Sequence, residues 1–440
     1  MYKVFKSIGL ILSSLVITPC VMAQENTNTT TVQTNANELN LTLDQAVKYA
    51  LEHNRSLKNA SLEVQKAEMQ RWQTIAQMLL QIDGTFQYTN MFGQEMNLGG
   101  MPIPMNPYGQ MTWQAAAGVS AQGIIGAQMQ RIAKEIQEIN VLKSEQDTKY
   151  DVESSYINIL ALEETANLLN KNMENLNSLK SMIDNAVKVG VAEQNDADQI
   201  SIQVVSMMNG LNSVKRSIET LYNALILSIG AESNVKINLT QKLEDVVNDG
   251  TILSLTGTDL DLNNNLDYQM LMKSNEITDK QKKMAIAAFF PTVGVAYQNA
   301  HKHYFGDAGF DMTPTNTFAA TVNVPVFSSG KRTCAVKEAK IAQQEQANTI
   351  EQTEIGLKVQ EKQLKFNLTS AYENYNIQKE NIRVMSNVFN SYSEKLKYGK
   401  ASSMDITNSS INLVSAQTNY INAVLDMVNA NISLKKLLNK

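Results

Sequence analysis

Two long stretches of the chain place apolar residues at alternating spacings of three and four, which is typical of helices packed in a coiled coil. The first stretch predicts a helix over about 127–189, which would be roughly 95 Å long at 1.5 Å per residue. Its apolar series has one break near Lys180 and consists of Val152, Tyr156, Ile159, Leu162, Ala166, Leu169, Met173, Leu176, Ile183 and Ala186. A second series lies near the C-terminus, at Ile411, Val414, Tyr420, Val424, Val428, Ile432 and Leu438. We therefore expect an elongated protein that is mainly α-helical.

The positions of the prolines separate the candidate helices from the candidate strands. Beyond residue 23, proline occurs only at 102, 104, 107, 291, 314 and 325, so 108–290 and 326–440 are free to form long helices. The zones that hold the prolines are mixed apolar and polar, and they predict four strands at about 82–91, 111–123, 292–299 and 316–326. The intervening segments 92–110 and 300–315 are predicted loops.

The chain contains an internal duplication. Lys188-Val-Gly190-Val-Ala192 matches Lys397-Tyr-Gly399-Lys-Ala401 at an offset of 209, and Asp196 then falls on Asp405. Each copy has the predicted order helix, strand, loop, strand, long helix, turn, long helix. We place the copies at 41–250 and 251–440, with hairpin tips at about 188–196 and 397–405.

The N-terminus resembles a cleaved secretory signal. Lys3 and Lys6 precede an apolar run from Ile8 to Val21, and Ala23 is a small residue at the expected cleavage point. A membrane anchor would need a longer run, and Pro19 fits poorly with lipidation at Cys20. We assign 1–23 to the signal peptide and the Asn/Thr-rich residues 24–40 to a flexible leader.

Composition narrows the class of protein. The 440 residues are 43% hydrophobic and 18% charged, with a net charge of −5, two cysteines and three histidines. A basic nucleic-acid surface and a Cys/His zinc site are thus disfavoured. Gly330-Lys331 is an incomplete phosphate loop, because Pro325 stands where its first glycine is needed. We predict no enzyme activity and no cofactor.

The four strands restrict the architecture further. Each is long enough to cross a membrane, and spanning strands must close into a barrel because a lipid-exposed sheet edge is not tolerated. About eight strands are the practical minimum for closure. Several copies of this chain must therefore share one barrel.

Four motifs together resemble the TolC family of outer-membrane efflux proteins, over about residues 39–440. The stretch LTLDQAVKYALEHN (41–54) resembles the family's opening helix, and FFPTVG (289–294) resembles its approach to a strand. VNVPVFSSGKR (322–332) resembles the passage from a barrel strand into a long helix, and 398–405 resembles a hairpin tip. The first copy departs from the pattern, since Gln81 and Gln122 replace Pro291 and Pro325.

The resemblance implies a homotrimer with long coiled-coil hairpins forming an α-barrel and with four strands per chain in a shared twelve-stranded β-barrel. It implies an outer-membrane exit duct of a tripartite efflux or type I secretion system, for drugs, toxic small molecules or proteins. The implied partners are a periplasmic adaptor and an inner-membrane RND or ABC transporter. Two other classes remain as alternatives: a passive trimeric coiled-coil adhesin and a secreted hydrolase.

The turns between the paired helices are the candidate sites. By the resemblance, Gly190, Val191, Gly399 and Lys400 lie at tips that contact the adaptor. Asp405, Asn408 and Asp196 are the candidates for the periplasmic constriction, where a threefold ring of carboxylates would attract cations. The alternative for both aspartates is ordinary capping of the following helix.

Other residues are weaker candidates. The loop 91–111 holds Met91, Met96, Met101, Met105 and Met111, whose thioethers could bind soft metals but are also common fillers. His301 and His303 alternate along one strand face and alone make a poor metal site. Aromatic residues that flank the strands predict interfacial belts, namely Tyr108, Trp113, Tyr297, Tyr304 and Phe310. The exported substrate and the class of pump are not encoded in any recognisable motif.

Overall fold

The computed structural model describes residues 38–190, 192–246, 254–305, 314–398 and 400–440. Its elements follow the predicted duplicated order. In the first half α2 (Leu43–His53) and α3 (Arg55–Ala76) precede the strands, and α4 (Ala121–Lys188) and α5 (Gln194–Ile229) follow them. In the second half α8 (Leu266–Ala287) precedes the strands, and α9 (Lys331–Lys397) and α10 (Ser403–Leu438) follow them.

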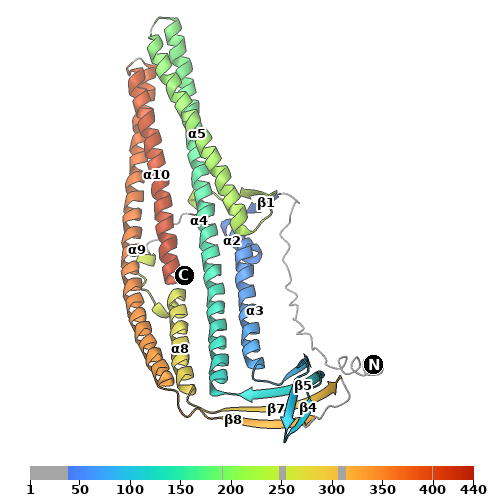
Figure 1. Ribbon diagram of the computed structural model, residues 1–440. Coiled ribbons are helices and arrows are strands. Elements are labelled where there is room, and N and C mark those ends of the chain that lie inside the picture. The colour runs from blue at the N-terminus through green and yellow to red at the C-terminus, as the bar shows by residue number, and fades with distance from the viewer. Residues whose placement is uncertain (1–37, 191, 247–253, 306–313, 399) are drawn as a thin grey trace.

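The molecule is elongated, with the sheet at one end and two helical hairpins at the other (Figure 1). Helix α4 has 68 residues and α9 has 67. At 1.5 Å per residue each is about 100 Å long, so both run from the sheet to the tips. The shorter helices α5 and α10 return from the tips only to mid-height, where the C-terminus lies (Figure 1).

One antiparallel sheet contains the four predicted strands. It has the order β2 (Gln81–Thr89), β5 (Tyr108–Val119), β7 (Thr292–Tyr304) and β8 (Asn316–Asn323). The two copies meet in the middle, where β5 pairs with β7 along twelve residue pairs from Tyr108↔Tyr304 to Val119↔Val293. The four predicted strands of one chain therefore form one continuous curved sheet.

Several predicted strand boundaries were wrong. The strand predicted at 111–123 begins earlier, at Tyr108, and ends at Val119, because Ser120 caps α4 through its side chain and starts the helix at Ala121. The strand predicted at 292–299 continues to Tyr304, and those predicted to end at 91 and 326 end at 89 and 323. Loop 92–110 also contains a hairpin of β3 (Glu95–Leu98) and β4 (Met101–Pro104). Half of the other predicted loop, residues 306–313, lies outside the described residues.

The two copies pass from strand to helix in different ways. In copy 1 only Ser120 separates β5 from α4, whereas in copy 2 residues 324–330 separate β8 from α9. That linker is fixed by Arg332, whose guanidinium donates to the Pro325 carbonyl at 2.7 Å and to Ser328 Oγ at 3.0 Å. At the start of β2, the amide of Gln81 donates to the Ala76 carbonyl at 2.7 Å and caps the end of α3. A hydrogen-bonding side chain thus stands at the β2 boundary of copy 1, where copy 2 has Pro291.

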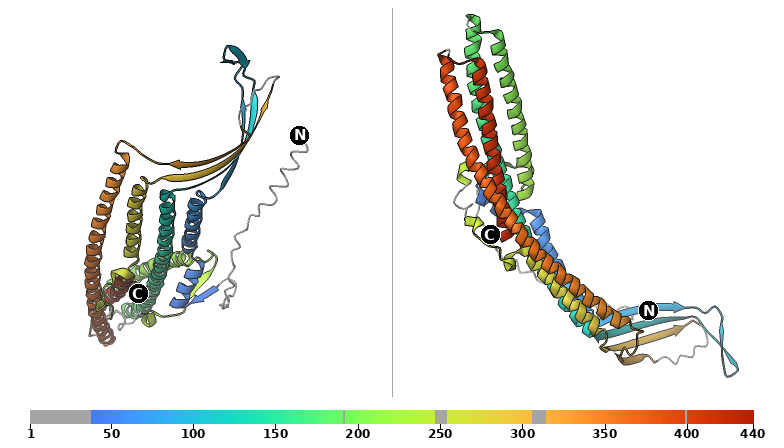
Figure 2. Two further views of the ribbon diagram at one scale, coloured as in Figure 1. Left: turned by 90° about the horizontal axis from the view of Figure 1, so that it is seen from below. Right: turned by 90° about the vertical axis from the view of Figure 1, so that its left-hand side faces the viewer.

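The helices form a row whose order follows that of the strands. Near the sheet the order of contacts is α3, α4, α8, α9, and toward the tips it is α5, α4, α10, α9. Seen from below, the four lower helices lie in a curved row (Figure 2). Helix α9 is consequently one edge of the chain along its whole length, and the other edge is α3 below and α5 above.

The main core lies at mid-height. It includes a small parallel sheet of β1 (Glu38–Leu41) and β6 (Lys236–Leu239), with α6 (Leu243–Val246) and the 3-10 helix η1 (Leu262–Asn264) nearby. Tyr156 is fully buried there, and its hydroxyl donates to the Leu41 carbonyl at 3.0 Å. The flexible leader was predicted to extend to residue 40, but Glu38, Leu39 and Asn40 belong to β1 because they pair with β6.

A second core joins the two hairpins near their tips. Leu176 is 1% exposed and packs with residues from α4, α5, α9 and α10, namely Leu179, Ile183, Ala197, Ile200, Phe389, Ile406 and Leu413. The predicted coiled-coil seam is confirmed at Leu176 and Ile183. It was wrong at Ile411, which is 44% exposed, while Leu413 is buried in its place.

Candidate channel-forming surfaces

One face of the sheet is apolar. The pairing register places Ile82, Ala115, Tyr297 and Phe318 in one row across the four strands. Rows toward the helices add Val119, Val293 and Val322, and rows away from them add Phe86, Met111 and Trp113. Phe318 is 71% exposed and Phe86 is 74% exposed, so within one chain this face lacks cover.

The opposite face is polar or small. The neighbouring row across the strands consists of Asp83, Gln114, Gln298 and Thr317. Other residues of this face are mostly threonine, glutamine, alanine and glycine, for example Thr85, Thr112, Gly118, Gly294 and Ala319. A sheet with one apolar and one polar face separates a nonpolar medium from an aqueous one.

Both edges of this sheet are open. Among the described residues, β2 pairs only with β5, and β8 pairs only with β7. Their outer backbone groups can therefore still accept another strand. An exposed edge of this kind is a template for pairing with a further chain.

The edge helix α9 carries an apolar stripe on its outer side. At about 100° per residue its members fall within about 60° of each other. They are on the side opposite to the buried Leu357 and Leu368. The exposed members are Ile341, Ile355, Val359, Phe366, Ile377, Val384 and Val388. A helix that is apolar on two opposite sides needs a packing partner on each.

The other edge has a similar stripe. Leu62, Met69 and Trp72 of α3 are exposed, as are Ile202 and Leu227 of α5. We did not predict either edge stripe. The sequence of α9 does contain the pattern that predicts its stripe: a second series of apolar residues, half a helical turn away from the inward-facing Leu357 and Leu368.

The first hairpin tip ends α4 and starts α5. Gly190 has φ +78°, a left-handed conformation that favours glycine, and it is exposed. The predicted tip residue Val191 lies outside the described residues. Asp196 is half-buried at the third position of α5, and the backbone N–H of Glu193 donates to its carboxylate at 3.4 Å.

The second tip ends α9 and starts α10. Gly399 lies outside the described residues, and Lys400 is exposed, with its N–H donating to the Lys395 carbonyl at 2.9 Å. Asp405 closes a capping box, because its Oδ2 accepts from the Ser402 N–H at 3.0 Å and from the Ser402 hydroxyl at 2.8 Å. Hydrogen bonds from the Ser402 backbone and side chain lower the pKa of Asp405.

The three constriction candidates are not brought together within one chain. Asp405 and Asn408 are exposed on the first turns of α10, and Asp196 starts α5 in the other hairpin. The capping interpretation of both aspartates is correct as a local structure. It leaves the carboxylate of Asp405 solvent-exposed, so a second role facing an aqueous passage stays a prediction.

The remaining candidates lie on the four-stranded sheet and on the separate β3–β4 hairpin. Of the five methionines, Met96 lies on β3, Met101 on β4 and Met111 on β5. His301 and His303 share the apolar face with Trp113 and Tyr297, as their register shows. Tyr108 and Tyr304 instead face the polar side, where their rings pack 5.5 Å apart. Phe310 lies outside the described residues.

Within the described ranges, none of the helices combines the length and apolar character that a membrane crossing requires.

The fold therefore defines the class: long α-helical hairpins continuous with a four-stranded, two-faced sheet. Residues 259–440 match the family model described as outer membrane efflux protein, which confirms the predicted resemblance over that part of the chain. This is a family of efflux proteins and not of enzymes. No match was found among curated protein sequences.

Solved structures show the same fold over nearly the whole chain. CusC, described in terms of transmembrane channel formation, is 16% identical, with a TM-score of 0.75 over 90% of this chain and 91% of its own. The CmeC outer membrane channel of Campylobacter jejuni is 16% identical, with a TM-score of 0.72 over 90% and 85%. The outer membrane protein VceC of Vibrio cholerae is 15% identical, with a TM-score of 0.72 over 90% and 95%.

Proposed function

We propose that this protein is the outer-membrane exit duct of a tripartite efflux or type I secretion system. In this proposal it receives drugs, toxic small molecules or proteins from a periplasmic adaptor and an inner-membrane RND or ABC transporter. The observation that carries the proposal is the four-stranded sheet, which has one apolar face, one polar face and two open edges.

Closure of this sheet requires more than one chain. Four strands are too few for a barrel, and an open edge is not tolerated in lipid. When three copies are joined in a ring, β8 of each pairs with β2 of the next and a twelve-stranded barrel results. The same rotation places the stripe of α9 against α3 and α5 of the next copy. The homotrimer thus satisfies the sheet edges and both apolar stripes at once.

The strand lengths fit an outer membrane. A tilted strand crosses the hydrocarbon layer with about 9–11 residues. The two central strands have 12 and 13 residues and the edge strands 9 and 8. With the apolar face toward lipid and the polar face toward the lumen, the helical hairpins extend into the periplasm. A cleaved signal over residues 1–23 is part of this proposal.

In this proposal the two sequence repeats contribute equivalent parts to the channel. Repeats 41–250 and 251–440 each supply two strands, one hairpin tip and half of the helical wall. In the proposed assembly Gly190, Val191, Gly399 and Lys400 contact the adaptor. Asp405, with Asn408 and Asp196 nearby, lines the periplasmic constriction.

Two adjacent residues on opposite faces of β8 test the proposal. Phe318→Lys places a charge on the apolar face, and Thr317→Lys is its matched control on the polar face. A lysine facing lipid near the bilayer midplane costs about 2–4 kcal/mol per copy, whereas a lumen position tolerates it. Phe318→Lys should therefore lower the amount of trimer in outer-membrane fractions.

Planar-bilayer recording completes the test. Thr317→Lys should insert normally, conduct, and shift ion selectivity toward anions. A coiled-coil adhesin would tolerate both substitutions and show no conductance. Equal membrane levels of the two variants, or wild-type protein that never conducts, would contradict the proposal.

A further inference from the structure

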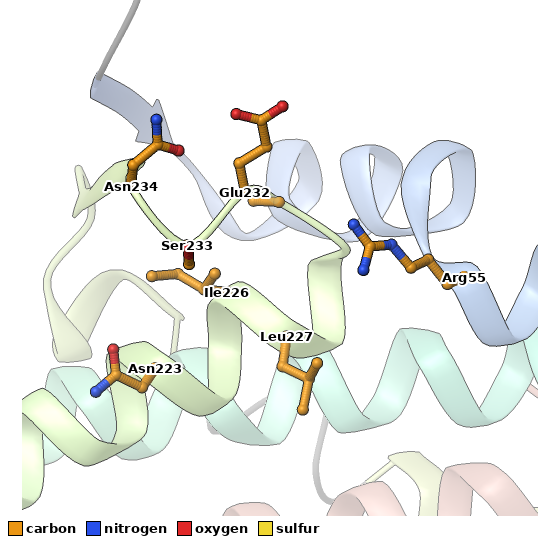
Figure 3. A pocket seen from close by; sticks show the side chains of 8 residues that line it. Arg55, Asn223, Ile226, Leu227, Glu232, Ser233 and Asn234 are labelled. Carbon is orange, nitrogen blue, oxygen red and sulfur yellow. The ribbon is translucent and has the colours of Figure 1, made fainter.

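A groove lies at mid-height on the chain edge formed by α3 and α5. It has a volume of about 640 Å³ and is lined by residues that include Arg55, Asn223, Leu227 and Glu232. Figure 3 shows Arg55 reaching from the start of α3 toward the loop that follows α5, with Leu227 on the last turns of α5. The groove is thus built where the edge of the chain changes from one helix to the other.

Leu227 is the unusual residue of this groove. It is 79% exposed, although Leu225 and Ile229 on the opposite side of the same helix are fully buried in the mid-height core. A large apolar side chain beside a concave surface indicates a site that is completed by another surface.

Val359, in the middle of the outer stripe of α9, lies at the same height along the molecule as this groove. A cavity lined by Arg55 and Leu227 also touches α4 between Ser144 and Asp151. A second cavity connects the same part of α4, at Lys143 and Gln146, to α9 between Leu357 and Leu364. Val359 of α9 lies in that range and is 61% exposed. Leu227 and Val359 are therefore level with each other on opposite edges of the chain.

Symmetry brings these two edges together. In the closed trimer of the proposed function, on which this inference rests, the copies are related by rotation about the channel axis without a shift along it. Residues at equal height on opposite edges then meet across each boundary between copies.

We propose that Val359 of a neighbouring copy enters this groove and covers Leu227. Lys362, one turn further along α9 and exposed beside the stripe, lies next to Glu232 with opposite charge. Phe366, which belongs to the same α9 stripe as Val359, packs beside Leu227 on the side toward the tips. The groove is thereby an inter-subunit socket that fixes the rotation of α9 against the next copy where α3 gives way to α5.

The test is cross-linking between paired cysteines in a Cys334→Ser protein, since the native Cys334 is exposed. Leu227→Cys together with Val359→Cys, treated with a short bis-maleimide in membranes, should give dimers and trimers on denaturing gels. Each single cysteine should give monomer, because like residues of different copies are far apart around the ring. The control pair is Leu142→Cys with Val359→Cys, because Leu142 is 49% exposed but lies on the interior helix α4.

Native mass spectrometry of the same samples separates the two proposals. A trimer that cross-links only through the 227–359 pair supports the socket. A trimer without that cross-link, or with equal cross-linking of the control pair, overturns the socket but leaves the channel proposal standing. A protein that is only monomeric overturns both, and a cross-link to another protein overturns the socket with a second copy as occupant.

Discussion

Truncation of Leu176 to alanine tests how the two hairpins are held together. Leu176 is 1% exposed and lies in a cluster to which α4, α5, α9 and α10 all contribute. The cluster is close to the tips and separate from the mid-height core, so its loss should loosen this end of the molecule without unfolding the rest.

The expected size of the effect follows from the burial. A buried Leu→Ala change costs about 2–5 kcal/mol, depending on how far the neighbours can close the cavity. The neighbouring side chains belong to four long helices that cannot shift independently, so the cavity should stay largely open. The loss of stability in Leu176→Ala should therefore be about 3 kcal/mol or more. A loss of about 3 kcal/mol raises the equilibrium constant for local opening by roughly 100-fold.

Hydrogen exchange followed by mass spectrometry measures this opening directly. In Leu176→Ala, amides in the last turns of α4 and the first turns of α5 and α10 should lose protection by roughly 100-fold, while those near Tyr156 stay unchanged. Met182→Ala is the matched control, because Met182 is on the same helix and 44% exposed. Protection that falls less than about threefold in Leu176→Ala, or equally in both variants, would refute the assignment of Leu176 to the inter-hairpin contact.

Three further changes test the turns. Gly230 has φ +76°, and an added Cβ would lie 2.5 Å from the His53 carbonyl oxygen. Gly230→Ala should therefore lower the free energy of unfolding by more than about 1–2 kcal/mol in chemical denaturation. Gly210→Ala is its control and should be stabilising, because Gly210 is within α5 and has open space around it. Gly190→Val strains a left-handed residue at an exposed tip, and should abolish export while membrane level and trimer formation stay normal; unchanged drug resistance in a strain with only this variant would count against adaptor docking. Asp405→Ala should reduce cation selectivity and block by trivalent cations from the periplasmic side in single-channel recordings, whereas a pure cap predicts unchanged conduction. Because hydrogen bonds from Ser402 lower the pKa of Asp405, the capping box should stabilise the tip above the ordinary carboxyl pKa and lose that contribution as pH falls through the lowered one.

The helical part of the fold could be predicted because its signals are local. The 3/4 spacing of apolar residues and the absence of proline depend only on neighbours in sequence, and they located α4 and the seam at Leu176. The hairpin tip at Gly190 was predictable for the same reason, since a left-handed turn selects glycine. The Ile411 error shows the limit, because a helix of 3.6 residues per turn drifts away from a strict heptad count and brings Leu413 inward instead.

Strand ends depended on contacts that sequence patterns do not display. The boundary after Val119 is set by the hydroxyl of Ser120, which accepts a hydrogen bond from the Gly123 N–H. The start of β1 at Glu38 is set by pairing with β6, about 200 residues away in sequence. The face on which Tyr108 and Tyr304 lie could be assigned only from the strand register. The register places both on the polar face rather than in an aromatic belt.

The sequence by itself determined that this protein consists of two similar halves with long helices, short strands and glycine turns. Tertiary structure alone decided which apolar residues of α9 face the chain and which face outward. Both sets are apolar and have a helical period. Only the packing of Leu368 in the mid-height core, with Leu357 buried on the same side of α9, identifies Val359 and Phe366 as the outer stripe. The physical reason is that periodicity specifies a stripe on a helix, whereas the partner of that stripe is fixed by the arrangement of all the helices around it.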